Sequence, residues 1–146
     1  MAFLPDGRRL LTAGGDRVLK LWDVQAGVVE RTFEGHPGAL LSVAVSPDGR
    51  FAVAGSGHYW ASGWRNADYY GMHMWDLASG QVVGCLETPC PISAVTFSDD
   101  SRRLVAGGED RVVRSWDLPD PATLVSRRLT EAPTASRISA VEPDKG

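Results

Sequence analysis

The stretch from His58 to Gly71, HYWASGWRNADYYG, gathers the side chains of this sequence that could do chemistry. Imidazole and carboxylate groups ligate zinc, so His58, Asp68 and the nearby His73 would make a conceivable metal site. Their spacing matches no zinc motif. We therefore expect neither a metal nor a cofactor here.

The same stretch is rich in aromatic residues, holding five of the chain's twelve. Tryptophan, tyrosine and arginine dominate the energetics of protein interfaces. We therefore predict a patch that binds another protein, made of Tyr59, Trp60, Trp64, Arg65, Asp68, Tyr69 and Tyr70. The alternative is that these aromatic rings fold back over the edge of their own sheet, as side chains of compact surface loops do.

Other catalytic patterns are weak. The segment GSGHYW at 55–60 begins like a dinucleotide-binding loop, but Trp60 stands where the third glycine is needed. No nucleophile with a histidine partner is recognisable from spacing. We therefore predict that the protein is not an enzyme. Cys85 and Cys90 flank a Thr-Pro turn and are expected to be buried or half-buried thiols, with a disulfide between them left open.

Composition narrows the class of protein. At 146 residues, with 43% hydrophobic residues, the chain suits a single domain with a sizeable core. Its net charge of −3 gives no electrostatic reason to expect nucleic acid or an anionic membrane as partner. The N-terminus shows no signal peptide and no apolar run is long enough to cross a membrane, which favours a cytoplasmic location.

The elements that would hold these residues repeat along the chain. Residues 10–23, LLTAGGDRVLKLWD, predict a strand, a tight turn and a second strand, and residues 103–117 repeat the pattern. A third copy begins with FAVAGSG at 51–57 and reaches its own Trp75-Asp76 after an insertion. Upstream turns place Asp6, Asp48, Asp100 and Asp144 at intervals of 42, 52 and 44 residues. Without the 11 extra residues of the insertion the middle interval is 41, and a period of about 40 to 45 residues is typical of a propeller blade.

These motifs give a family resemblance. With Trp22-Asp23, Trp75-Asp76, Trp116-Asp117, the Gly35-His36 dipeptide and the Pro-Asp-Gly turns, nearly the whole chain resembles a WD-repeat β-propeller protein. The resemblance implies an all-β fold of about three four-stranded antiparallel blades, cut within the first strand at both ends. The expected units are blade 1 (1–35), blade 2 (36–88, with the insertion 58–71), blade 3 (89–130), and a tail that begins a fourth inner strand (131–146). The outer strand of blade 3 is expected at 124–129 and the fourth inner strand at 138–141.

The resemblance also implies a structural hydrogen-bonded group in each blade, formed by a crossing-loop histidine, a hydroxyl on the second strand, a turn aspartate and a third-strand tryptophan. The residues that match are Thr12, Asp16, Trp22, His36, Trp75, Asp110 and Trp116. No copy is complete, because Ala54 and Ala106 replace the hydroxyl, His58 replaces one aspartate, and the third crossing loop has no histidine. Trp75 and Trp116 are expected to be buried.

Closed propellers typically need four or more blades, so we expect a segment of a longer propeller or a chain that completes its ring by association. The function implied by the resemblance is a non-catalytic protein-interaction scaffold. Its partners would be other proteins or the remaining blades. One alternative is a sensor segment of a multidomain bacterial signalling protein, and another is a propeller enzyme or small-ligand binder.

Overall fold

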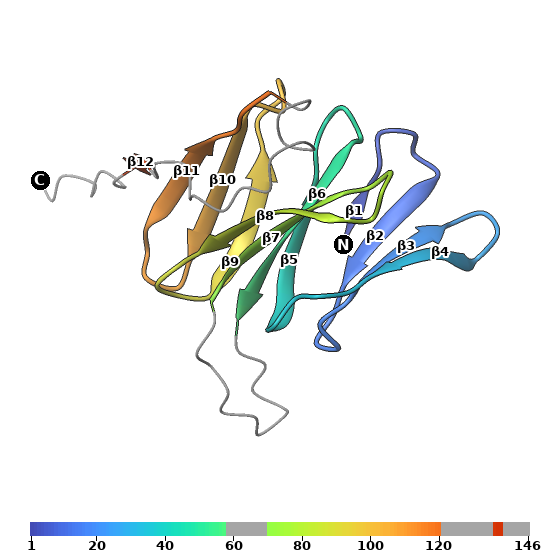
Figure 1. Cartoon of the computed structure of the whole chain (residues 1–146), viewed down its shortest axis with the longest axis horizontal. Helices are drawn as coiled ribbons and strands as arrows, with labels where there is room; N and C mark the ends of the chain where they lie inside the picture. The colour runs from blue at the N-terminus through green and yellow to red at the C-terminus, as the bar shows by residue number, and fades with distance from the viewer. Residues whose placement is uncertain (58–69, 121–135, 139–146) are drawn as a thin grey trace, which may run out of the picture.

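The computed structural model describes residues 1–57, 70–120 and 136–138, and in this part of the chain every regular element is a β-strand. Three antiparallel four-stranded sheets lie side by side in chain order (Figure 1). The first holds β1 (Ala2–Phe3), β2 (Arg9–Ala13), β3 (Leu19–Asp23) and β4 (Val28–Phe33). The second holds β5 (Ala39–Val45), β6 (Phe51–Gly57), β7 (Gly71–Asp76) and β8 (Val82–Glu87). The third holds β9 (Ile92–Phe97), β10 (Arg103–Gly108), β11 (Val113–Asp117) and β12 (Ser136–Ile138). We call these sheets blades 1, 2 and 3.

The predicted turns between the first two strands of each blade are formed by aspartate side chains. In blade 2 a carboxylate oxygen of Asp48 accepts hydrogen bonds from the Ser46 hydroxyl and from the Arg50 backbone N–H. Asp100 bonds Ser98 and Arg102 in the same way in blade 3. Gly49 follows with a φ of 72°. Because glycine adopts positive φ without steric cost, the Pro-Asp-Gly sequence specifies this turn locally.

The three blades share one hydrogen-bonded register. Leu10 pairs with Trp22, Ala52 with Trp75 and Leu104 with Trp116 across the second and third strands. The repeat read from the sequence is therefore a repeat in space, and the predicted all-β propeller segment of four-stranded antiparallel blades is confirmed.

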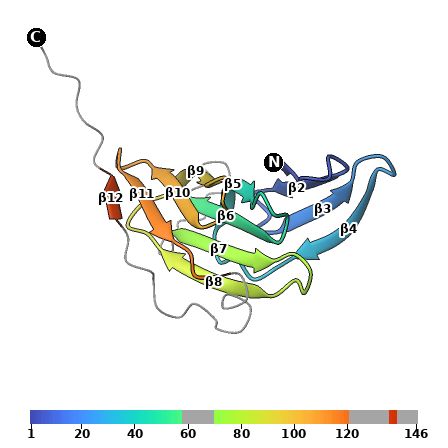
Figure 2. The same cartoon turned by 90° about the horizontal axis from the view of Figure 1, so that it is seen from above.

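The hydrophobic core lies between the blades, which stack face to face (Figure 2). One cluster joins Leu11, Leu19 and Leu21 of blade 1 to Ala52 and Trp75 of blade 2. The other joins blade 2 to blade 3, and its members include Val53, Met72, Met74, Ile92, Leu104 and Trp116. Trp75 is 0% exposed and Trp116 is 3% exposed, so their predicted burial is confirmed. Each blade is thus stabilised mainly by its neighbours.

The end of the chain differs from the expectation. Residues 136–138 form β12, which pairs with β11 as the outer strand of blade 3. Ile138 was expected to begin an inner strand of a further blade, and the expected outer strand at 124–129 falls outside the described residues, as do 139–141. A short strand-forming run takes its identity from the edge that it pairs with, and here that edge is β11.

No helix that could cross a membrane occurs in the described ranges.

Candidate functional site

The insertion is held at one rim of blade 2. The chain leaves the sheet at Gly57 and re-enters it at Gly71, and these two residues lie beside the crossing loops at 34–38 and 88–91. The buried Ser56 hydroxyl joins the two ends, because it donates to the Gly71 carbonyl and accepts from the Gly71 N–H, both at 3.1 Å. The base of the insertion is therefore rigidly attached to the sheet.

Most of the predicted partner-binding patch lies outside the described residues. This applies to Tyr59, Trp60, Trp64, Arg65, Asp68 and Tyr69, and also to His58 of the conceivable metal site. Tyr70 is described: it is half-buried, and its carbonyl accepts a 2.9 Å hydrogen bond from the Thr88 N–H. Both sides of the insertion base are thus fastened, one through Ser56 and one to the next crossing loop.

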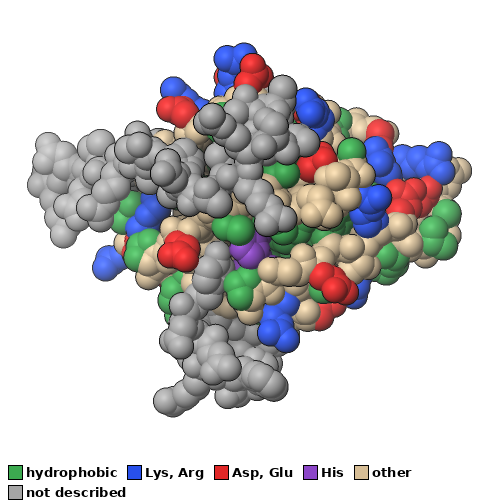
Figure 3. Space-filling model, viewed as in Figure 1, with side chains coloured by type: hydrophobic (Ala, Val, Ile, Leu, Met, Phe, Trp, Pro, Cys, Tyr) green, Lys and Arg blue, Asp and Glu red, His purple; other side chains and the backbone are tan. Residues whose placement is uncertain are grey.

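A cluster of rings lies beneath this rim. His36, in the crossing loop that enters blade 2, stands edge-on to His73 of β7 with ring centroids 4.4 Å apart. Both rings pack on Trp75, with ring centroids 6.2 Å from Trp75 for His36 and 5.8 Å for His73. A histidine is just visible among hydrophobic side chains in the middle of the face shown in Figure 3. Burial, together with the neighbouring His73, lowers the pKa of His36 to about 4, and burial lowers the pKa of His73 as well. Both rings are therefore neutral at physiological pH.

The hydrogen-bonded group implied by the resemblance is present in part in blade 1. The Trp22 indole N–H donates to the Thr12 hydroxyl at 2.9 Å. Asp16 is exposed and pairs with Lys20, also at 2.9 Å. In blade 2, Ala54 stands where Thr12 stands in blade 1, and the buried indole N–H of Trp75 has no hydrogen-bond partner among the described residues.

Blade 3 replaces the missing parts with other chemistry. Asp110 forms a bidentate ion pair with Arg114, and a nitrogen of the same guanidinium lies 3.9 Å from the Cys90 sulfur. The pKa of Asp110 lies well below its usual range because of the Arg114 hydrogen bonds. Across the second and third strands, Lys20 pairs with residue 12, His73 with residue 54 and Arg114 with residue 106. Arg114 therefore occupies the position that Lys20 holds in blade 1 and His73 holds in blade 2. One strand position therefore carries a different cation or imidazole in each blade.

Sequence reasoning missed the residue that takes the place of the absent third histidine. In the crossing loop to blade 2, a ring nitrogen of His36 lies 2.9 Å from the Gly38 carbonyl, two residues on. In the crossing loop to blade 3, the buried Thr88 hydroxyl donates to the Cys90 carbonyl at 2.9 Å, again two residues on. When the two crossing loops are aligned by the aspartate turn that follows each of them, Thr88 lies opposite His36. This alignment would have identified Thr88 from the sequence.

No disulfide joins the two cysteines. Cys90 is buried as expected, whereas Cys85 is exposed because it lies on the outer strand β8 with its side chain toward solvent. Within the described ranges, no three histidine, cysteine or acidic side chains come together as metal ligands.

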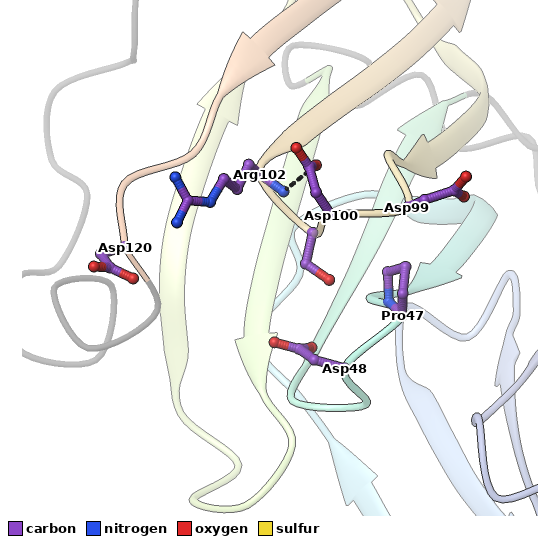
Figure 4. A pocket seen from close by; sticks show the side chains of 7 residues that line it. Pro47, Asp48, Asp99, Asp100, Arg102 and Asp120 are labelled. Carbon is purple, nitrogen blue, oxygen red and sulfur yellow. Dashed lines mark hydrogen bonds between the residues drawn. The ribbon is translucent and has the colours of Figure 1, made fainter.

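A shallow cavity of about 420 Å³ lies at the opposite rim, between the turns of blades 2 and 3 (Figure 4). Its lining carries four carboxylates and one guanidinium, from Asp48, Asp99, Asp100, Asp120 and Arg102. The turn aspartates are already engaged: Asp48 with Ser46, and Asp100 with Ser98 and the Arg102 backbone. Most of the lining residues belong to these two turns, whereas Asp120 follows β11.

Comparisons with known proteins agree with this architecture. The model of the family described as WD domain, G-beta repeat, matches residues 1–23, 27–60 and 80–117. The chain is 31% identical over 113 residues to autophagy-related protein 16 of Arabidopsis thaliana, covering 75% of this chain and 20% of that protein. It is 25% identical over 131 residues to eukaryotic translation initiation factor 3 subunit I of Candida albicans, covering 86% and 34% respectively. It is 29% identical over 112 residues to target of rapamycin complex subunit LST8 of Mus musculus, covering 75% and 31%. The chain thus spans between a fifth and about a third of the length of these relatives.

Proposed function

The chain belongs to the WD-repeat family, described as WD domain, G-beta repeat, and on this premise we propose that it is a non-catalytic scaffold for protein–protein interaction. The observation that carries the proposal is the kind of protein that it resembles. Two of its relatives are named as subunits of larger assemblies, an initiation factor and a target of rapamycin complex. The proposed role for this chain is likewise to hold other proteins together.

The proposed contact surface is the insertion at the rim of blade 2. Its aromatic and arginine side chains suit an interface, and the described residues on either side supply a fixed base through Ser56, Gly71 and Thr88. A rigid base lowers the entropy that binding must remove. With a net charge of −3, a protein partner suits the chain better than nucleic acid does.

The enzyme and small-ligand alternatives have less support. The paired histidines pack against each other and on Trp75, and Asp110 and Arg114 are engaged with each other. The cavity between the turns is lined mostly by residues that build those turns, together with Asp120 from the segment after β11. We therefore propose no catalytic residue.

The proposal is tested by identifying a partner and then removing one aromatic side chain. Cross-linking of the tagged full chain in cells, read by mass spectrometry, names the partner and the cross-linked residues. Affinity is then measured by calorimetry with purified proteins. Trp64→Ala should weaken binding by more than about 1 kcal/mol, or roughly fivefold, while thermal unfolding stays unchanged.

The matched control is Gln25→Ala, which changes an exposed residue of the turn between β3 and β4, away from the insertion. It should leave both affinity and stability unchanged. If Trp64→Ala instead lowers the unfolding temperature and spares binding, the insertion is part of the packing of blade 2 and the proposed contact surface is wrong.

A further inference from the structure

Blade 1 carries an exposed apolar face that its position in the repeat explains. Among the described residues, the large hydrophobic side chains in contact with solvent are concentrated in the first 41 residues. Phe3 is 58% exposed, Val24 48% and Val29 41%. Phe3 is paired with Leu10, Leu10 with Trp22, and Trp22 with Val29, so these residues form one row across all four strands. Partners in a row lie on the same face of a sheet.

The same row in blade 2 is covered by blade 1. Val45 pairs with Ala52, Ala52 with Trp75, and Trp75 with Val82, which repeats the register of blade 1 step by step. Ala52 and Trp75 are fully buried in the cluster shared with blade 1, and Val45 and Val82 pack against it. Leu77, the counterpart of Val24, packs there too.

In blade 3 the row is covered by blade 2. Phe97, Leu104, Trp116 and Leu118 are all buried in the cluster that joins these two blades. The structure therefore shows twice what covers this row, and each time it is the opposite face of another blade. We call the row-bearing side of a blade its leading face, and the side that covers a neighbour its trailing face.

The trailing faces also follow a shared register. The pair Leu11 and Leu21 covers blade 2, and the equivalent pair Val53 and Met74 covers blade 3. In blade 3 this pair is Val105 and Ser115, both half-buried, and Val113 takes the place of Met72. The chain thus has a leading face on blade 1 and a trailing face on blade 3 that no other described blade covers.

We propose that the leading face of blade 1, with Phe3, Trp22 and Val29, docks on the trailing face of blade 3 of a second copy of this chain. The stacking of blades then continues between copies as it does within one. Both halves of the contact are present in every copy, and the two joints inside the chain show that such faces fit. The contact is heterologous, so copies associate head to tail into a ring or a chain. It does not depend on the scaffold role proposed above, because it uses neither the insertion nor a foreign partner.

The test is sedimentation velocity of the purified full chain over a wide range of concentrations. Wild type should associate as its concentration rises. Val29→Lys places a charge in the leading face and should weaken association at least tenfold. Val28→Lys is the matched control, because Val28 is 52% exposed and its side chain points to the other side of the same strand. It should associate like wild type.

A mixing experiment decides whether unlike faces meet. Ser115→Lys should also weaken association, since it changes the trailing face. Val29→Lys keeps an intact trailing face and Ser115→Lys keeps an intact leading face, so an equimolar mixture should form a one-to-one dimer. Circular dichroism checks that each variant is folded, and Phe3→Ser replaces Val29→Lys if that variant is not.

Three results would overturn the proposal. The first is a wild-type chain that stays monomeric at every concentration, which leaves other blades as the occupant of the leading face. The second is equal behaviour of Val28→Lys and Val29→Lys. The third is a mixture that fails to form the dimer, which would mean that the leading and trailing faces do not bind each other.

Discussion

His36 and His73 approach edge to face with ring centroids 4.4 Å apart, although one lies in a crossing loop and the other in the third strand of blade 2. Their contact, together with the packing of both rings on Trp75, fastens the loop between two blades to the interior of the second. Neither ring can gain a proton without placing charge in this buried cluster.

The stability of the protein should therefore depend on pH through His36. Its pKa is about 4 in the folded protein against 6.5 for an ordinary histidine. A lowered folded-state pKa means that the unfolded chain binds the proton more readily. The free energy of unfolding should thus be highest above about pH 6.5 and should fall, by up to about 3 kcal/mol, as the pH decreases to about 4.

Urea unfolding at a series of pH values measures this dependence, with His36→Gln as the comparison. The variant lacks the titrating ring, so its stability should fall less steeply in the same window, with His73 accounting for part of the remaining slope. Equal slopes for wild type and His36→Gln would contradict the assignment to His36.

Gly55 and Gly107 occupy equivalent positions on the second strands of blades 2 and 3, yet substitution should affect them differently. A Cβ at Gly55 would lie 2.6 Å from the Cγ2 atom of Ile92, inside the joint between the blades. A Cβ at Gly107 would meet nothing within 4 Å. Gly55→Ala should cost about 1–3 kcal/mol through overpacking.

Gly107→Ala is the matched control and should leave stability unchanged or slightly raised, because alanine restricts the unfolded chain more than glycine does. Chemical unfolding of both variants gives the comparison. Similar losses for the two would show that the joint at Ile92 can widen to take a methyl group.

Asp110 and Asp16 provide a second matched pair, since each bonds the basic residue four positions on. The Arg114 side chain is 10% exposed, whereas the Lys20 side chain is 38% exposed. Removing the partner of a mostly buried guanidinium leaves a charge without compensation. Asp110→Asn should cost about 1–3 kcal/mol, and Asp16→Asn about 0.5 kcal/mol or less.

Thermal and urea unfolding of these two variants, at low and at high salt, test the difference. The loss in Asp110→Asn should persist at high salt because burial shields the pair from ions, while any loss in Asp16→Asn should disappear. A loss of the same size in both variants would show that burial of Arg114 contributes nothing.

The sequence by itself determined the repeat, the strands and the turns. Alternating strand residues, the Pro-Asp-Gly turns and the regular Trp-Asp pairs are local signals, and a strand or a turn forms from the chemistry of a few neighbouring residues. The family, and with it the burial of Trp75 and Trp116, could be predicted because the Trp-Asp pairs repeat in register along the chain. The partner-binding patch stays a prediction, because of its seven residues only Tyr70 is described.

The tertiary structure decided what each repeat does with the same local pattern. Trp22 and Trp75 share one register, yet Trp75 is fully buried while Trp22 is only half-buried, because blade 1 covers one and no described blade covers the other. Ser136–Ile138 completes blade 3 by pairing with β11, a strand that lies about twenty residues earlier in the chain. Burial and pairing depend on which second surface is present, and a single stretch of sequence does not encode its neighbour.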